Sequence, residues 1–200
     1  MYNKIAQQLR QPTGIWGKII SKFLKKMNGE IYTQMIKEVD ANDDDKIYEI
    51  GYGHGSGVFQ LAKQANCIVN GIDFSEVMFV DAVKLNQKFI REDRVHLTFG
   101  DFLSASLPTH EYTKVFCVNV IYFWNDLEQP FAQVRNMLTK NGVFFIYMDS
   151  LTEIENSRFT NTENFNLYDV DGVKTKLVKI GFKATHYNYG RGHVIRALKA

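Results

Sequence analysis

The chain has 200 residues, of which 45% are hydrophobic and 23% charged, and its formal net charge is +2 at pH 7. These values are typical of one globular domain, and so small a charge does not indicate nucleic acid binding without a clustered basic face. No apolar run approaches the roughly 20 residues that cross a bilayer, and the N-terminus lacks a signal-peptide pattern. Because Cys67 and Cys117 fall in predicted buried strands, we expect free thiols and a cytoplasmic protein.

Residues 1–40 are predicted to be helical and distinct from residues 41–200. Between Trp16 and Met27, apolar residues recur at helical spacing and lysines occupy the other positions. Such a helix can pack its apolar face on the domain, which we favour, or make weak contact with an anionic membrane surface. A second apolar stripe runs from Ile31 to Val39. Because these helices precede the first strand, we expect them to form a lid over the site.

The segment from Lys46 to Gly57 begins as a short apolar strand, reaches the acidic Glu49, and then carries a glycine at every second position from Gly51. Glycines there permit a tight turn and a close approach of the backbone to a ligand. An apolar helical pattern follows, and the free N–H groups of a helix start can face the same ligand. The pattern therefore predicts a cofactor-binding strand, turn and helix.

Strands and helices alternate after this turn. Further strands are expected at 67–72, 95–99, 114–120 and 143–148, with helices between them. In the helix after Ser75, the residues Met78, Ala82, Leu85 and Phe89 share one face, and Asn141-Gly142 is expected to end the next helix and start a strand. Residues 151–166 are expected to form a connecting loop or flap before a helix at 169–179. Residues 182–189 and 193–198 flank a glycine-containing turn and predict a hairpin.

Alternation of continuous apolar strands with helices predicts an α/β fold with a mostly parallel seven-stranded sheet, helices on both faces and a C-terminal antiparallel hairpin. Chemically distinctive residues follow four of the strands, at the edge where such sheets bind ligands. Besides the glycine turn these are Asp73, which is placed to accept hydrogen bonds from ribose hydroxyls, Asp101-Phe102, which suits an adenine ring, and Asn119-Val120. The dinucleotide fingerprint fails because Ser56 stands at its third glycine position.

Together these motifs resemble class I S-adenosylmethionine-dependent methyltransferases, a family with a Rossmann-like fold. The segment 49–55 is similar to their E/D-x-G-x-G-x-G motif, 71–75 to their second motif and 100–102 to their third. Residues 118–124 resemble the strand-four segment of the small-molecule branch, nearest to the ubiquinone/menaquinone-biosynthesis type. The turn at 140–142 departs from that branch, with Lys-Asn-Gly where Pro-Gly-Gly is usual.

The resemblance implies that S-adenosylmethionine is the cofactor, that S-adenosylhomocysteine is the product and that no metal is needed. The implied cofactor-binding residues are Glu49, Gly51, Tyr52, Gly53, Gly55, Asp73, Phe74, Met78, Asp101, Phe102 and Asn119. The acceptor is expected to be a small molecule, not nucleic acid, with His54, Tyr122 and Trp124 as candidate contacts. No catalytic residue stands out, because direct displacement needs a general base only for some acceptors. A non-catalytic S-adenosylmethionine-binding protein and a membrane-surface methyltransferase acting on a lipid-like acceptor remain alternatives, and the oligomeric state is open.

Overall fold

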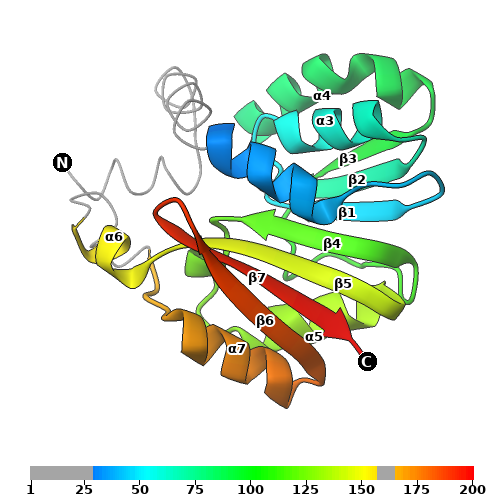
Figure 1. Cartoon of the computed structure of the whole chain (residues 1–200). Helices are drawn as coiled ribbons and strands as arrows, with labels where there is room; N and C mark the ends of the chain where they lie inside the picture. Colours follow the sequence, from blue (N-terminus) through cyan, green and yellow to red (C-terminus); the bar gives the residue numbers. More distant parts are fainter. Residues whose placement is uncertain (1–28, 157–164) are drawn as a thin grey trace.

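The computed structural model describes residues 29–156 and 165–200, and Figure 1 shows their arrangement. Residues 29–39 are helical and precede the first strand. The elements that follow are β1 (Lys46–Ile50), α3 (Ser56–Gln64), β2 (Ile68–Asp73), α4 (Glu76–Arg91), β3 (Val95–Phe99), β4 (Tyr112–Val118), the 3-10 helix η1 (Ile121–Phe123), α5 (Glu128–Met137), β5 (Leu138–Asp149), α6 (Leu151–Asn156), α7 (Val170–Lys179), β6 (Phe182–Tyr189) and β7 (Gly192–Lys199).

The strands of the described residues form one seven-stranded sheet in the order β3-β2-β1-β4-β5-β7-β6. Strands β3, β2, β1, β4 and β5 pair in parallel, whereas β7 lies antiparallel between β5 and β6. The predicted α/β fold with its antiparallel C-terminal hairpin is therefore confirmed. The strand order reverses between β1 and β4, and open α/β sheets bind ligands beside such a point, at the carboxyl ends of the strands.

Two apolar cores lie on opposite faces of the sheet because successive side chains of a strand point to opposite sides. Ile47 packs in one core with residues of the helix 29–39, α3 and α4, whereas Tyr48 packs in the other with residues of α5 and α7. Figure 1 shows the same division, with the helix 29–39, α3 and α4 on one face and α5 and α7 on the other. The predicted helices on both faces are confirmed.

The apolar stripe predicted between Ile31 and Val39 is confirmed as a helix whose apolar side chains join the first of these cores. The amphipathic segment between Trp16 and Met27 lies outside the described residues, and the boundary at residue 40 stays a prediction. Among the described residues, no helix is both long and apolar enough to cross a membrane. Cys67 and Cys117 are buried and free, as predicted.

Three local predictions were wrong. Strand β5 begins at Leu138 instead of Val143, because Leu138 already pairs with Tyr112 and a register shift follows before Lys114. The segment predicted as a loop from residue 151 starts with helix α6, which is too short for a periodic pattern and buries only Ile154. On α4 the buried face carries Asn86, whereas Leu85 is 38% exposed.

Candidate functional site

The loop after β1 is shaped by three glycines in left-handed backbone conformations. Their φ angles are 72° at Gly51, 53° at Gly53 and 80° at Gly55, a region that favours glycine. A Cβ atom at Gly51 would lie 2.6 Å from Val120 Cγ2, and one at Gly55 would lie 2.7 Å from Asn86 Nδ2. A Cβ atom at Gly53 would meet nothing within 4 Å. Gly51 and Gly55 therefore permit internal packing, whereas Gly53 faces open space that a ligand can enter.

Asp73, at the end of β2, holds this loop in place. Its Oδ2 accepts the backbone N–H of Gly53 and its Oδ1 accepts that of Ser75, each at 2.8 Å. Burial raises the pKa of Asp73 to about 6, although both hydrogen bonds act in the opposite direction. Each oxygen retains a further lone pair, so Asp73 can accept hydrogen bonds from a ligand while it orders the loop.

Glu49 is fully buried at the end of β1, beneath the start of α3. Its Oε1 accepts a 3.0 Å hydrogen bond from the hydroxyl of Tyr32, whereas its Oε2 has no hydrogen-bond partner among the described residues. A Cβ atom at Gly57 would lie only 2.7 Å from Oε2, so glycine leaves room for the carboxyl group. Burial raises the pKa of Glu49 to about 8. A buried oxygen without a donor is costly unless a ligand supplies one.

The start of α4 adjoins Asp73. The Ser75 hydroxyl caps this helix by accepting the backbone N–H of Met78 at 3.4 Å, and the Met78 side chain is buried while Phe74 is partly exposed. Asn86, one of the residues that sequence reasoning missed, donates from Nδ2 to the carbonyl oxygen of Gly55 at 3.0 Å. The sequence feature that could have identified Asn86 is its position as a polar residue among apolar neighbours on one face of the helix.

Asp101 and Phe102, which follow β3, point in different directions. Asp101 is exposed and accepts weak hydrogen bonds from the Leu103 backbone and the Ser104 hydroxyl, each at 3.3 Å. Phe102 is buried, and its ring centroid lies 5.9 Å from that of Trp124. The sequence assigned Phe102 to the cofactor and Trp124 to the acceptor, and the structure places the two rings in one apolar cluster.

Asn119 and Tyr122, which follow β4, are tied to the end of β5. Asn119 adopts a φ of 57°, and its Oδ1 accepts the backbone N–H of Asp149 at 3.2 Å. The Tyr122 hydroxyl donates to the carbonyl oxygen of Asp149, also at 3.2 Å, and burial raises its pKa well above the ordinary value. These contacts fix the carboxyl ends of β4 and β5 relative to each other.

The two remaining predicted residues lie in the glycine loop. Tyr52 is buried against Gly71 of β2, and its hydroxyl donates to the carbonyl oxygen of Thr98 at 3.0 Å. Through these contacts Tyr52 anchors the glycine loop on the sheet. His54 is partly buried between Gly53 and Gly55.

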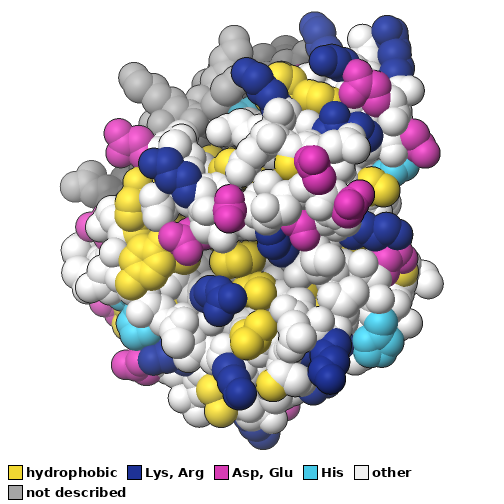
Figure 2. Space-filling view, turned by 45° about the vertical axis from the view of Figure 1, so that its right-hand side comes forward, with side chains coloured by type: hydrophobic (Ala, Val, Ile, Leu, Met, Phe, Trp, Pro, Cys, Tyr) yellow, Lys and Arg dark blue, Asp and Glu magenta, His cyan; other side chains and the backbone are white. Residues whose placement is uncertain are grey.

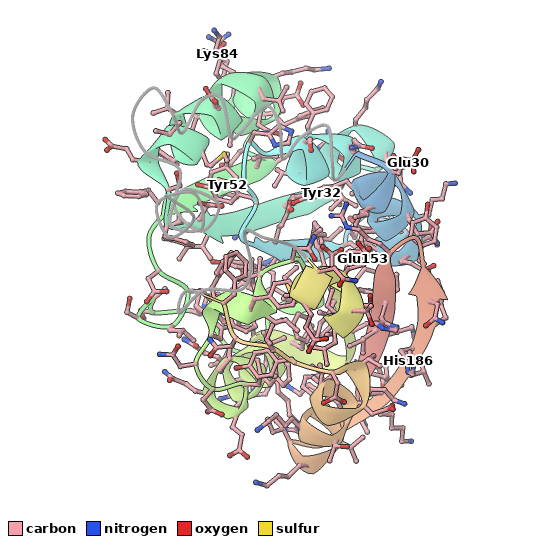
Figure 3. All side chains as sticks on the ribbon, turned by 90° about the vertical axis from the view of Figure 1, so that its left-hand side faces the viewer. Glu30, Tyr32, Tyr52, Lys84, Glu153 and His186 are labelled. Atoms are coloured by element: carbon pink, nitrogen blue, oxygen red, sulfur yellow. The ribbon has the colours of Figure 1, made fainter. Side chains whose placement is uncertain are left out.

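Tyr32 is the most informative residue that the sequence did not single out. Figure 3 shows it directed from the helix 29–39 toward the middle of the molecule. Its place in an apolar helical stripe predicted a core residue, and burial agrees with that, but its hydroxyl reaches Glu49. Only the three-dimensional fold brings these two residues together, because 17 positions separate them in the chain.

The fold and the glycine loop define a Rossmann-like α/β domain with a ligand edge at the carboxyl ends of its parallel strands. Residues 47–142 match the family described as "Methyltransferase domain". The match covers just under half of the chain, and together with this fold it supports the predicted resemblance to class I S-adenosylmethionine-dependent methyltransferases. The ubiquinone/menaquinone branch stays a prediction.

Several known proteins are similar to this chain. It is 24% identical over 152 residues to the sterol 24-C-methyltransferase of Eremothecium gossypii, an alignment that covers 70% of this chain but only 40% of that protein. A chain in the complex of the Haloferax volcanii Trm112 methyltransferase activator with a methyltransferase aligns with a TM-score of 0.81 at 10% identity, over 99% of this chain and 97% of that one. Geranyl diphosphate C-methyltransferase from Streptomyces coelicolor aligns with a TM-score of 0.70 at 12% identity, over 87% and 78%. At these identities the two structures show the fold alone.

Proposed function

We propose that this protein is an enzyme that transfers a methyl group from S-adenosylmethionine to a small-molecule acceptor by direct in-line displacement. The observation that carries the proposal is the open left-handed position at Gly53, which lies between the end of β1 and the carboxylate of Asp73. A loop of this shape lets a ligand approach the backbone closely, and Asp73 supplies the acceptor for a ribose diol.

The residues fit the cofactor at each of its polar ends. In this proposal Glu49 Oε2 takes the amino group, the backbone from Gly51 to Gly55 surrounds the methionine portion, and Asp73 takes the ribose hydroxyls. Asp101 is exposed beside β3 and takes the adenine amine, with Phe74 and Met78 near the ring. Asn119 lies at the methionine end. The buried oxygen of Glu49 that lacks a donor supports this assignment.

The chemistry of the bound group is that of a sulfonium, whose methyl carbon is open to displacement by a nucleophile. The chain contributes binding and orientation, which can supply roughly 7–11 kcal/mol of the barrier. Tyr122 and Trp124 are buried aromatic residues that follow β4, and His54 lies in the glycine loop. We propose these three as acceptor contacts and assign no general base.

A small acceptor agrees with the relatives, whose names describe sterol and geranyl diphosphate C-methyltransferases. Figure 2 shows acidic and basic side chains interspersed on the face it displays, an arrangement that does not form the basic stripe of a nucleic acid site. We further propose a cytoplasmic enzyme, since two buried free thiols suit a reducing compartment.

The test is transfer of label from methyl-labelled S-adenosylmethionine to a panel of isoprenoid, sterol and small amine acceptors. Labelled product with at least one acceptor, lost in Gly53→Ala, is the expected result. Binding of S-adenosylmethionine without transfer to any acceptor would favour a non-catalytic binding protein. The role of the N-terminal segment is tested by deleting residues 1–28, which should reduce turnover much more than folding if that segment forms a lid.

The second candidate function is a membrane-surface enzyme acting on a lipid-like acceptor, and it rests on the lysine-rich segment between Trp16 and Met27. Co-sedimentation with anionic vesicles, lost when its lysines are replaced by glutamine, would support this version. Absence of co-sedimentation would favour an acceptor that reaches the enzyme from solution.

A further inference from the structure

A cavity lies between the start of the helix 29–39 and the turn that joins β6 to β7. Its volume is about 390 Å³, and it is lined by Glu30, Ile31, Tyr189, Gly190 and Arg191. Figure 1 shows this turn reaching toward the start of the helix, at the edge of the sheet where β4 ends. Small-molecule sites in proteins commonly have volumes of about 300–1,000 Å³, so the cavity is large enough for a small ligand.

The helix wall of this cavity adjoins the cofactor side of the proposed site. Ile31 immediately precedes Tyr32, whose hydroxyl donates to Glu49 Oε1 at 3.0 Å. Figure 3, which looks onto the edge where the parallel strands end, shows Glu30 and Tyr32 on the same helix at this edge. The cavity therefore begins one residue away from a side chain that reaches the end of β1.

The turn wall of the cavity adjoins the acceptor side. Arg191 Nε donates to Asp149 Oδ1 at 2.9 Å, and the carbonyl oxygen of Arg191 accepts the backbone N–H of Ser150 at 3.0 Å. The backbone of Asp149 is bonded in turn to the side chains of Asn119 and Tyr122. Arg191 is thus connected through one residue to proposed contacts of both the cofactor and the acceptor.

The described lining of the cavity carries one charge of each sign. Glu30 is exposed at the helix start, whereas the side chain of Arg191 is only 28% exposed. A guanidinium group has five N–H donors in a planar fork, so Arg191 can hold a carboxylate with its terminal nitrogens while Nε holds Asp149. Glu153 of α6 also acts electrostatically on Arg191. Because these carboxylates outnumber the guanidinium group, a purely anionic ligand such as a diphosphate is disfavoured.

We propose that this cavity binds the methyl acceptor and that the acceptor is a zwitterion with an apolar body, as a hydrophobic amino acid is. This inference rests on the proposed function and narrows its substrate class. The carboxylate of the acceptor pairs with Arg191, its ammonium group pairs with Glu30, and its apolar body contacts Ile31 and Tyr189. Arg191 and Glu30 determine specificity in this account. The methylated atom is another part of the acceptor, because a protonated amine has no free lone pair.

Three probes with the same phenyl body separate the two charges. L-Phenylalanine carries both, phenethylamine lacks the carboxylate, and hydrocinnamate lacks the ammonium group. Titration calorimetry on protein saturated with S-adenosylhomocysteine should show that L-phenylalanine binds about tenfold more tightly than phenethylamine. It should bind only about threefold more tightly than hydrocinnamate, because Glu30 is exposed and exposed ion pairs are weak.

Substitutions assign each preference to one residue. Arg191→Met should remove the preference for L-phenylalanine over phenethylamine, and Glu30→Gln should remove the preference over hydrocinnamate. Arg191→Lys keeps a positive charge beside Asp149 but loses the planar fork, so it should retain the fold and only part of the preference. A merely structural role of Arg191 would weaken the binding of all three probes alike and leave their ratios unchanged.

Arg196→Met and Glu38→Gln are the matched controls. Arg196 is exposed on β7 and Glu38 lies on the helix 29–39, and neither lines the cavity. Both substitutions should leave the ratios unchanged. Equal affinity of the three probes, or no binding of L-phenylalanine to the loaded protein, would overturn this inference and leave the proposed function standing. Failure of S-adenosylhomocysteine to bind would overturn the proposed function and this inference with it.

Discussion

The backbone N–H of Gly53 donates to Asp73 Oδ2 at 2.8 Å, so the loop after β1 is tied to the end of β2. The carboxylate proposed to hold the ribose is therefore the same group that orders the loop proposed to hold the methionine portion. Binding and loop order are coupled through this one side chain, and substitutions at Asp73 should affect both.

Asp73→Asn tests that coupling. Asparagine retains one oxygen but loses the charge and one acceptor, so S-adenosylhomocysteine should bind at least tenfold more weakly, with a melting temperature lowered by only a few degrees. Asp44→Asn is the control, because Asp44 is an exposed turn residue with a φ of 69° that asparagine tolerates. Calorimetry and thermal melts of the two variants provide the measurement. Wild-type affinity in Asp73→Asn would contradict the proposed role.

Gly53→Ala and Gly55→Ala should separate binding from folding. Both positions are left-handed, which costs alanine about 1–2 kcal/mol, but only Gly55 also meets Asn86 and Ala82 at 2.7 and 2.8 Å. Gly55→Ala should therefore lower the free energy of unfolding clearly more than Gly53→Ala. Gly53→Ala should abolish detectable ligand binding, because its methyl group enters the open space. Urea unfolding and calorimetry check the two effects, and equal destabilisation by both substitutions would contradict this reading of the loop.

The stability of the ligand-free protein should fall as pH rises from about 6.5 to 8. The pKa of Glu49 is about 8 in the folded protein, above its ordinary value, so its contribution to stability is present at low pH and is lost as pH rises through 8. One such group changes the free energy of unfolding by at most about 1.4 kcal/mol per pH unit. Asp73 has a pKa of about 6, so its titration changes the stability mainly below pH 6.5.

Glu49→Gln should flatten this dependence, because glutamine does not titrate. Urea unfolding of the wild-type protein and of Glu49→Gln at pH 6.5, 7.2 and 8.0 measures the difference in slope. The same slope in both proteins would mean that another group controls the change.

Lys199→Met should destabilise the fold without a direct effect on the site. Lys199 is almost fully buried on β7, and its Nζ donates to the carbonyl oxygens of Arg135 and Leu138, each at 2.6 Å, at the end of α5. Loss of hydrogen bonds from a charged donor should cost about 1–3 kcal/mol and lower the melting temperature by roughly 2–12 °C. Lys183→Met, at an exposed position of β6, should have little effect. Similar melting temperatures for the two variants would contradict this assignment.

The order of strands and helices was predictable because long apolar runs and glycine or proline turns mark it locally. Strand β1, the glycine loop and the hairpin of β6 and β7 are examples. The start of β5 was not predictable, because it depends on pairing between Leu138 and Tyr112, which are far apart in the chain. Helix α6 was missed because one buried residue, Ile154, gives no periodic signal.

The site was predictable where a residue type is demanded by backbone geometry. The sequence predicted a tight turn at Gly51, Gly53 and Gly55, and all three have left-handed conformations that favour glycine. The contacts of Tyr32 and Asn86 were not predictable, since each looks like a helix-face residue until the fold places it against Glu49 or Gly55. The burial of Phe102 against Trp124 likewise depends on packing between separate loops.

The most direct test of the proposed function is calorimetric titration of the wild-type protein and Asp73→Ala with S-adenosylmethionine and S-adenosylhomocysteine. Micromolar binding of both ligands by the wild-type protein, weakened at least tenfold in Asp73→Ala, is the predicted result. Failure of the folded wild-type protein to bind either ligand would contradict the assignment of this site to S-adenosylmethionine.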